Sequence, residues 1–394
     1  KVTNASLVKV PFDLAYWQRV AAKKYPNGLP EPQSDDPTQW LFHGHPAGRV
    51  PLSGTALPGG GFSGEQDQGK GEETGPKPGA TLHIAIARLI GYRWPAELDS
   101  SMRLAPEARA WVEKCKELES FADDDGVVPL VPMRGEPAAE GRVRDLLRAA
   151  FGGEAGGWSS AKEATLLAAA AEANGGKGGA NPPSLDDWLK NRFFAEHCAL
   201  FHQRPFVWHI WDGRKKDGFG VLVHYHRLAA ANGEGRRLLE KITHGYLGDW
   251  IARQRDEMKA NKAGADARLA AALDLQKKLE AIVAGEPPFD IFVRWKPLHE
   301  QPIGWEPDIN DGVRMNIRPF IEAGVLRDKV NVKWTKDRGQ EPKSIRPKAD
   351  FPWFWNGTGG GPAAVEGGFA GERVNDVHLS VAEKQKAREA KGVK

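Results

Sequence analysis

The sequence predicts an α+β protein: a mostly helical N-terminal part, then mixed short strands with a long helical hairpin. Three observations predict this class. Apolar residues recur at helical spacing in several stretches before residue 175. Two strand-like runs, 206–211 and 219–228, flank a turn-rich loop, which is typical of a β-hairpin. Two amphipathic stretches joined by a short polar turn predict an antiparallel helix pair over 235–284.

The N-terminal half divides into two predicted regions. Residues 1–80 form an irregular, loop-rich segment, because Gly, Ser, Pro and polar residues dominate 51–78 and indicate a long flexible loop. Residues 81–175 form a helical region, and Gly91 ends its first helix. The helices expected here cover 81–90, 105–121, 142–151 and 161–174, with a short extended piece at 127–131. The glycine-rich run 175–179 predicts a domain boundary.

Residues 176–380 are predicted to form a mixed α+β domain. Ser184 and Asp187 resemble a capping box that opens a helix reaching residue 201. Helices at 235–261 and 266–284 form the hairpin, whose turn is 262–264. Further strands are expected at 289–295, 313–317 and 330–334, and residues 381–394 form a charged tail.

Composition narrows the class of protein without choosing a function. The chain of 394 residues can hold two or three domains, and its net charge is only +3. The sequence has no apolar run long enough to cross a bilayer, so we expect no membrane association. Two cysteines cannot form a disulfide framework and suit a reducing cytoplasm. The 14 tryptophans suit a packed core or a surface for planar or anionic partners, and burial is favoured for any single one.

Three patterns approach a catalytic or metal motif, and each has a simpler interpretation. The run 181–184, Asn-Pro-Pro-Ser, lacks the aromatic residue of an adenine methyltransferase loop and is better explained as the lead into a helix. The pairs His43 and His45, and His224 and His226, lack further metal ligands at suitable spacing. We therefore predict no catalytic residue and no metal site in this chain.

A nuclease pattern is also weak. Asp308 with Glu341 and Lys343 resembles the acidic and basic residues of a metal-dependent nuclease. Pro342 lies between the last two and disfavours the strand that this chemistry needs.

Candidate DNA contacts gather in the last third of the chain. In the segment 294–318, amide and guanidinium groups could contact base edges or phosphates, although a polar turn held by ion pairs explains them equally well. The stretch 327–348 has eight Lys or Arg residues against three acidic ones, which suits phosphate binding or a solvated loop. The predicted DNA-contacting residues are Arg294, Lys296, Asn310, Arg314, Asn316, Arg318, Lys329, Lys333, Trp334, Lys336 and Arg338.

The order of several long blocks resembles the C-terminal region of large adenine-specific DNA methyltransferases of the BREX and DISARM phage-defence systems, which are relatives of fused restriction–modification methylases. The blocks are 204–213 (RPFVWHIWDG), 218–226 (GFGVLVHYH), 246–251 (YLGDWI), 289–297 (FDIFVRWKP) and 304–320 (GWEPDINDGVRMNIRPF). Shorter blocks at 89–95 and 375–378 also look like that family, and the likeness covers most of residues 80–380.

The resemblance implies that the parent enzyme uses S-adenosylmethionine to methylate the exocyclic amine of adenine in double-stranded DNA. It implies that the methyl-transfer domain lies upstream and that this region completes the DNA clamp. No donor loop or catalytic loop is present, so no catalytic residue of the family can be assigned here, and no cofactor is expected in this chain. The alternatives are a protein-interaction scaffold in a defence complex and, less well supported, a metal-dependent nuclease.

Overall fold

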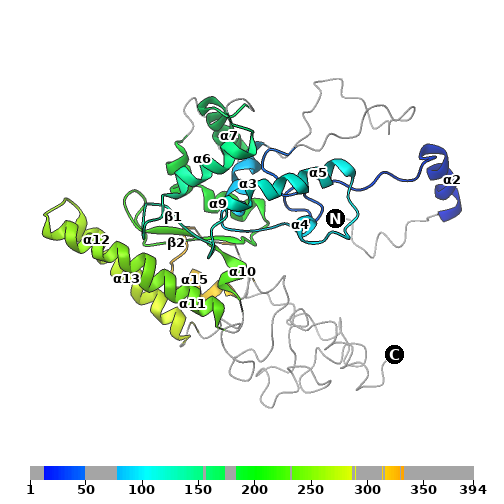
Figure 1. Cartoon of the computed structure of the whole chain (residues 1–394). Helices are drawn as coiled ribbons and strands as arrows, with labels where there is room; N and C mark the ends of the chain where they lie inside the picture. Colours follow the sequence, from blue (N-terminus) through cyan, green and yellow to red (C-terminus); the bar gives the residue numbers. More distant parts are fainter. Residues whose placement is uncertain are drawn as a thin grey trace, which may run out of the picture.

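The computed structural model confirms an α+β fold, in which helices surround a small antiparallel sheet (Figure 1). It describes residues 13–48, 78–153, 157–173, 183–230, 233–285, 289, 313, 316–328 and 330–331. Several predicted features lie outside these residues: the loop at 51–77, the strand at 289–295 except its first residue, the nuclease pattern and the tail.

The N-terminal helices follow the sequence prediction closely from residue 78 onward, but the prediction of an irregular segment over 1–80 is wrong at 14–24, where the Asp13 side chain caps a helix. They are α2 (Leu14–Lys24), α3 (Pro78–Leu89), α4 (Pro95–Leu98), α5 (Pro106–Lys114), η1 (Cys115–Phe121, a 3₁₀ helix), α6 (Ala139–Ala150) and α7 (Ser160–Ala173). Every residue from 81 to 90 is buried, because α3 is apolar on nearly all sides and can lie in the centre of the core. Gly91 follows this helix at φ 86°, a left-handed conformation that glycine adopts without strain.

The sheet joins the two halves of the chain. Its strands are β1 (Val127–Pro129), β2 (Val207–Trp211) and β3 (Gly220–His224), in the order β1-β3-β2. All neighbours are antiparallel, with Val128 opposite Leu222 and Trp208 opposite Val223. Since β1 precedes the glycine-rich run and β3 follows it, one hydrophobic core crosses the predicted domain boundary.

The prediction of a strand over 219–228 is wrong beyond residue 224. The chain turns there into the short helix α10 (Tyr225–Leu228), and the His224 side chain caps it by accepting a bond from the backbone of His226. His224 and His226 therefore do not share one face of a strand. Ser184 caps the helix as expected, but that helix is divided at Arg192 into α8 (Leu185–Asn191) and α9 (Phe193–Leu200).

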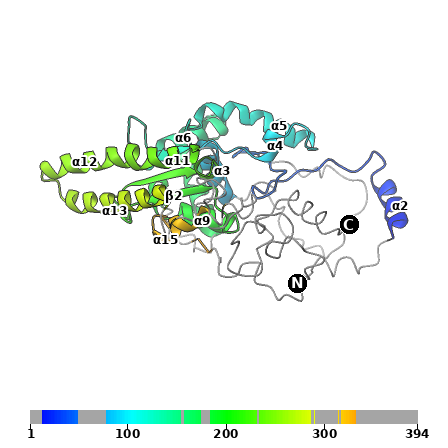
Figure 2. The same ribbon diagram turned by 90° about the horizontal axis from the view of Figure 1, so that it is seen from below.

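The helical hairpin is confirmed and projects away from the sheet (Figure 2). It consists of α11 (Glu234–Glu240), a π-helical segment η2 (Lys241–Tyr246), α12 (Leu247–Lys259) and α13 (Ala265–Ala284). Gly264, at φ 74°, makes the turn between the last two. Widened π turns often occur near functional sites.

A second strand prediction, over 313–317, is also wrong. Ile317 donates a helical hydrogen bond to the carbonyl of Val313 at 3.0 Å, and the helix α15 (Arg318–Glu322) follows. The alternating pattern of apolar and polar residues there is too short to distinguish a strand from one helical turn. Val330 and Asn331 have no regular structure, and the rest of the strand expected at 330–334 lies outside the described residues.

Candidate nucleic-acid interface

The structure describes only two of the predicted DNA-contacting residues, Asn316 and Arg318. Asn316 is fully buried, and its side-chain amide donates to the hydroxyl of Tyr225 at 3.1 Å. Arg318 pairs with Glu322 at 2.7 Å on the same turn of α15. Their contact with DNA stays a prediction. The others lie outside the described residues: Arg294, Lys296, Asn310, Arg314, Lys329, Lys333, Trp334, Lys336 and Arg338.

A rigid loop between β2 and β3 carries three consecutive cations. Asp212 organises this loop, because its carboxylate accepts the backbone N–H groups of Phe219 at 2.8 Å and Arg214 at 3.0 Å. Burial raises the pKa of Asp212, although these bonds oppose the shift. A side chain at Gly218 would collide with that carboxylate, since an added Cβ would lie 2.1 Å from Oδ1. The loop therefore presents its cations from a fixed backbone.

We call the surface around this loop the basic hairpin: the side chains of Lys190, Arg214, Lys215 and Lys216. All four line one small pocket beside the sheet, and none of the described residues that line it is a carboxylate. Lys190 pairs with Asp186, and Arg214 holds Asp217 through two bonds of 3.0 and 2.9 Å. Lys215 and Lys216 are exposed and have no ion pair among the described residues.

Arg327 fixes the start of the predicted basic stretch against the same sheet edge. Its guanidinium donates to the carbonyl of Lys190 at 2.8 Å and lies 4.3 Å from the centre of the Trp211 ring. Its backbone donates to the carbonyl of His209 at 3.0 Å. Cation–π stacking and backbone hydrogen bonding thus hold Arg327 beside Lys190 and Trp211, which are distant from it in sequence.

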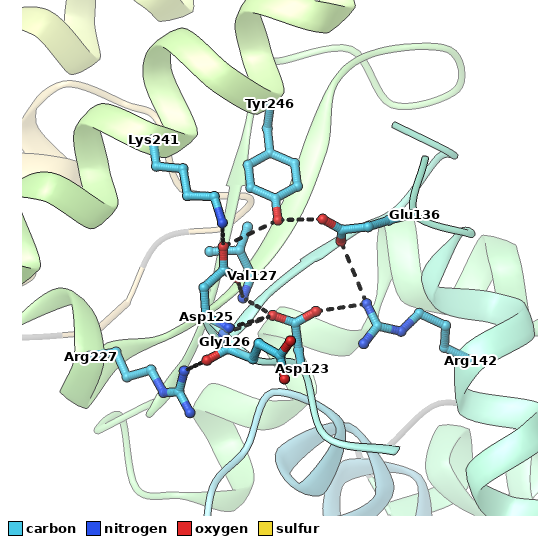
Figure 3. A network of polar contacts seen from close by, with 10 residues as sticks. Asp123, Asp125, Gly126, Val127, Glu136, Arg142, Arg227, Lys241 and Tyr246 are labelled. Carbon is cyan, nitrogen blue, oxygen red and sulfur yellow. Dashed lines mark hydrogen bonds and ion pairs between the residues drawn. The ribbon is translucent and has the colours of Figure 1, made fainter. Parts of the chain in front are cut away.

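A second cluster, which we call the polar junction, lies at the base of the helical hairpin (Figure 3). It consists of Asp123, Asp125, Glu136, Arg142, Lys241 and Tyr246. Asp123 accepts three backbone N–H groups of its own loop and pairs with Arg142 at 2.9 Å. Asp125 pairs with Lys241 from the π-helical segment, and Tyr246 donates to Glu136 at 2.7 Å. A neighbouring contact joins Arg227 to the carbonyl of Asp124.

Ionisation in the polar junction is set by burial and by close partners. Burial raises the pKa of Asp125, and the adjacent carboxylate of Asp123 adds to this effect. Burial would also raise the pKa of Asp123, but its hydrogen bonds and Arg142 hold it below the usual range. Burial raises the pKa of Glu136, and burial together with the bond to Glu136 raises the pKa of Tyr246.

The polar junction is therefore best explained as a structural connection. It joins the loop before β1, the turn at Glu136 and the π-helical segment through charges that satisfy one another. Within the described part of the chain, no group of three or more His, Cys, Asp or Glu residues is arranged to hold a metal ion.

The histidine pairs that the sequence singled out use ring nitrogens for local turns. His43 accepts the backbone N–H of His45 at 3.0 Å, and His224 accepts that of His226 at 3.2 Å. Burial lowers the pKa of His43, His45 and His224 to about 3. These imidazoles are neutral at physiological pH and satisfy backbone groups inside the fold.

Sequence reasoning missed the basic hairpin. The signal was present as the run Asp-Gly-Arg-Lys-Lys-Asp-Gly over 212–218, which has three adjacent cations inside a turn. What the run does not show is that Lys190 and Arg327 converge on the same place.

Comparison with known proteins adds no further constraint. No protein-family model matches the chain, and no curated protein is significantly similar to it. Among the helices that the structure describes, none combines the length and the apolar character required to cross a membrane.

Proposed function

We propose that this chain is the DNA-binding, target-recognition part of an adenine-specific N6 DNA methyltransferase of a bacterial phage-defence system, working in the cytoplasm. The single observation that supports DNA binding is the basic hairpin: four cations around one pocket whose described lining residues include no carboxylate, beside the start of the basic stretch 327–348. Methyl transfer, with its S-adenosylmethionine, is supplied by a separate upstream domain that this chain contacts.

In this proposal, the basic hairpin positions the protein on the duplex and does not read its sequence. Lysine side chains on a fixed loop suit phosphate oxygens, which carry affinity without base discrimination. Each phosphate contact releases condensed counterions, so affinity falls as salt rises. Base reading is assigned to residues 294–318, where amide and guanidinium groups are concentrated.

The test compares two double variants with the same loss of charge. Lys215→Ala/Lys216→Ala should weaken binding to duplex DNA of any sequence and lower the slope of log affinity against log salt by about two. The control, Lys259→Ala/Lys277→Ala, removes two exposed lysines from α12 and α13. An equal loss of affinity in both variants would show only a general charge effect and would remove the basic hairpin from the proposal.

A separate measurement tests the assignment of chemistry to another domain. Purified alone with labelled S-adenosylmethionine and duplex DNA, the chain should transfer no methyl group, and adding the upstream domain should restore transfer. Methylation by the chain alone would overturn this part of the proposal.

One observation favours the scaffold alternative. Helix α2 stands apart from the other described helices in both views and exposes Leu14, Tyr16 and Trp17 (Figures 1 and 2). Exposed aromatic side chains on a helix are typical of helix-in-groove contacts with a protein. If Trp17→Ala abolished association with the upstream domain while the lysine variants bound DNA normally, the scaffold would replace the DNA-binding proposal.

A further inference from the structure

The pocket inside the basic hairpin has a buried, unpartnered imidazole in its wall. His209 lies on β2 and is only 2% exposed, and its Nδ1 has no hydrogen-bond partner within the described part of the chain. A buried polar atom without a partner is costly, so native structures normally supply one. His209 lines the pocket together with the four cations, and its other ring nitrogen, Nε2, lies on the side of Gly220.

Glycine keeps this pocket open. Gly220 on β3 faces the imidazole, and an added Cβ would approach His209 Nε2 to 3.0 Å and a methyl of Leu130 to 2.9 Å. The space at the centre of the pocket measures about 10 Å³. That volume holds one water-sized group, such as a single oxygen of a larger anion whose remaining atoms stay at the mouth.

The charges around the pocket select the sign of the ligand. The acidic side chains nearby are each engaged elsewhere: Asp186 with Lys190, Asp217 with Arg214 and Arg268, and Asp212 with backbone N–H groups. Lys215 and Lys216 have no such partner among the residues described. An anion at the mouth would therefore meet uncompensated positive charge.

We infer that this pocket binds a phosphate group, with one oxygen accepting a hydrogen bond from the His209 imidazole and the others meeting Lys190, Lys215 and Lys216. The inference rests on the proposed function for the source of the phosphate, which is the DNA backbone. Burial, together with Arg327, lowers the pKa of His209 to about 3, so the ring is neutral and offers one N–H donor. Phosphate oxygens are strong acceptors and suit this donor and the ammonium groups.

The test follows the His209 ring nitrogens by NMR while inorganic phosphate is added to the whole chain, with chloride at equal ionic strength as the reference. Saturable shifts of these nitrogens with phosphate alone support the pocket. Gly220→Ala should lower the affinity for phosphate about tenfold or more by filling the space. Gly248→Ala is the matched control, because nothing lies within 4 Å of its added Cβ. If Gly220→Ala unfolds, the affinity for phosphate is measured in His209→Gln instead. This variant lacks the imidazole donor and should bind phosphate more weakly.

Adding duplex DNA separates this inference from the proposed function. Displacement of phosphate by DNA, with the same His209 shifts, supports both. Phosphate binding that DNA does not displace keeps the pocket but makes free phosphate its ligand, and the DNA-binding proposal loses its supporting observation. If His209 responds to neither ligand while the lysine variants still weaken DNA binding, the pocket is overturned and the proposed function stands.

Discussion

The polar junction and the basic hairpin use the same kinds of side chain in opposite ways. In the polar junction, carboxylates from the loop before β1 meet Arg142 and Lys241, and Tyr246 donates to Glu136. In the basic hairpin, four cations surround a pocket that no carboxylate lines, and two of them have no ion pair among the described residues. The difference shows that charge density alone does not identify a binding surface; the number of partners already present does.

This comparison has an energetic basis. A partly buried charge that loses its partner leaves the other charge desolvated, which destabilises the fold strongly. An exposed, unpaired lysine contributes little to folding, and its charge remains available to a ligand. Variants in the polar junction should therefore change stability, whereas variants in the basic hairpin should change binding.

The largest expected effect comes from the polar junction. Asp123→Ala removes the acceptor of three backbone N–H groups and leaves Arg142 without its closest partner, so the free energy of unfolding should fall by about 3–5 kcal/mol. Urea unfolding measures this loss, and Lys216→Ala serves as the comparison. Equal stability of the two variants would break the distinction between the regions.

The next effect depends on pH and belongs to His209, which lines the pocket beside the basic hairpin. The pKa of His209 is about 3 in the folded protein and about 6.5 when unfolded, so only the unfolded state binds its proton between these values. The contribution of His209 to the free energy of unfolding is fully present above pH 6.5. It falls by about 1.4 kcal/mol for each pH unit toward pH 3. His209→Gln should reduce the slope of stability against pH by that amount. An unchanged slope would mean that His209 titrates normally.

A smaller effect is expected at Arg327, a cation that lies beside the basic hairpin but is already bound to its neighbours. Arg327→Lys keeps the charge but cannot reproduce the flat stack on Trp211 together with bonds to Lys190 and Asn191. We expect a loss of about 1–2 kcal/mol in unfolding free energy. Thermal unfolding would measure this loss. If the variant were as stable as the wild type, Arg327 would contribute little to folding, like Lys215 and Lys216.

The smallest effect is expected at Tyr246. Tyr246→Phe removes one hydrogen bond to Glu136 and should cost about 1 kcal/mol. The same bond lowers the pKa of Glu136, so its loss should raise that pKa further above the usual value. A carboxyl titration by NMR would check this, and a pKa that moves down would contradict the described geometry.

The sequence by itself determined most of the local structure. The two amphipathic stretches over 235–284 predicted the helical hairpin, Ser184 predicted a helix start, and Gly91 predicted a helix end. These features depend on neighbours within a few residues, so the periodicity of the chain is enough to find them. The strand ending at His224 and the helical turn before Arg318 were missed, because runs this short fit both conformations until tertiary packing decides.

Only the tertiary structure decided which charges are free. The sequence shows a charged run at 123–125 and another at 214–217 with equal clarity. Arg142 and the distant Lys241 pair with Asp123 and Asp125 in the first, whereas Lys215 and Lys216 in the second have no ion pair among the described residues. The pocket beside His209 likewise depends on segments that are distant in sequence. Gly220 pairs with Trp211 across the two strands, and Arg327 stacks on the Trp211 ring. Helical and strand periodicity is a local property of the chain, whereas the surroundings of a charge are assembled from segments that meet only when it folds.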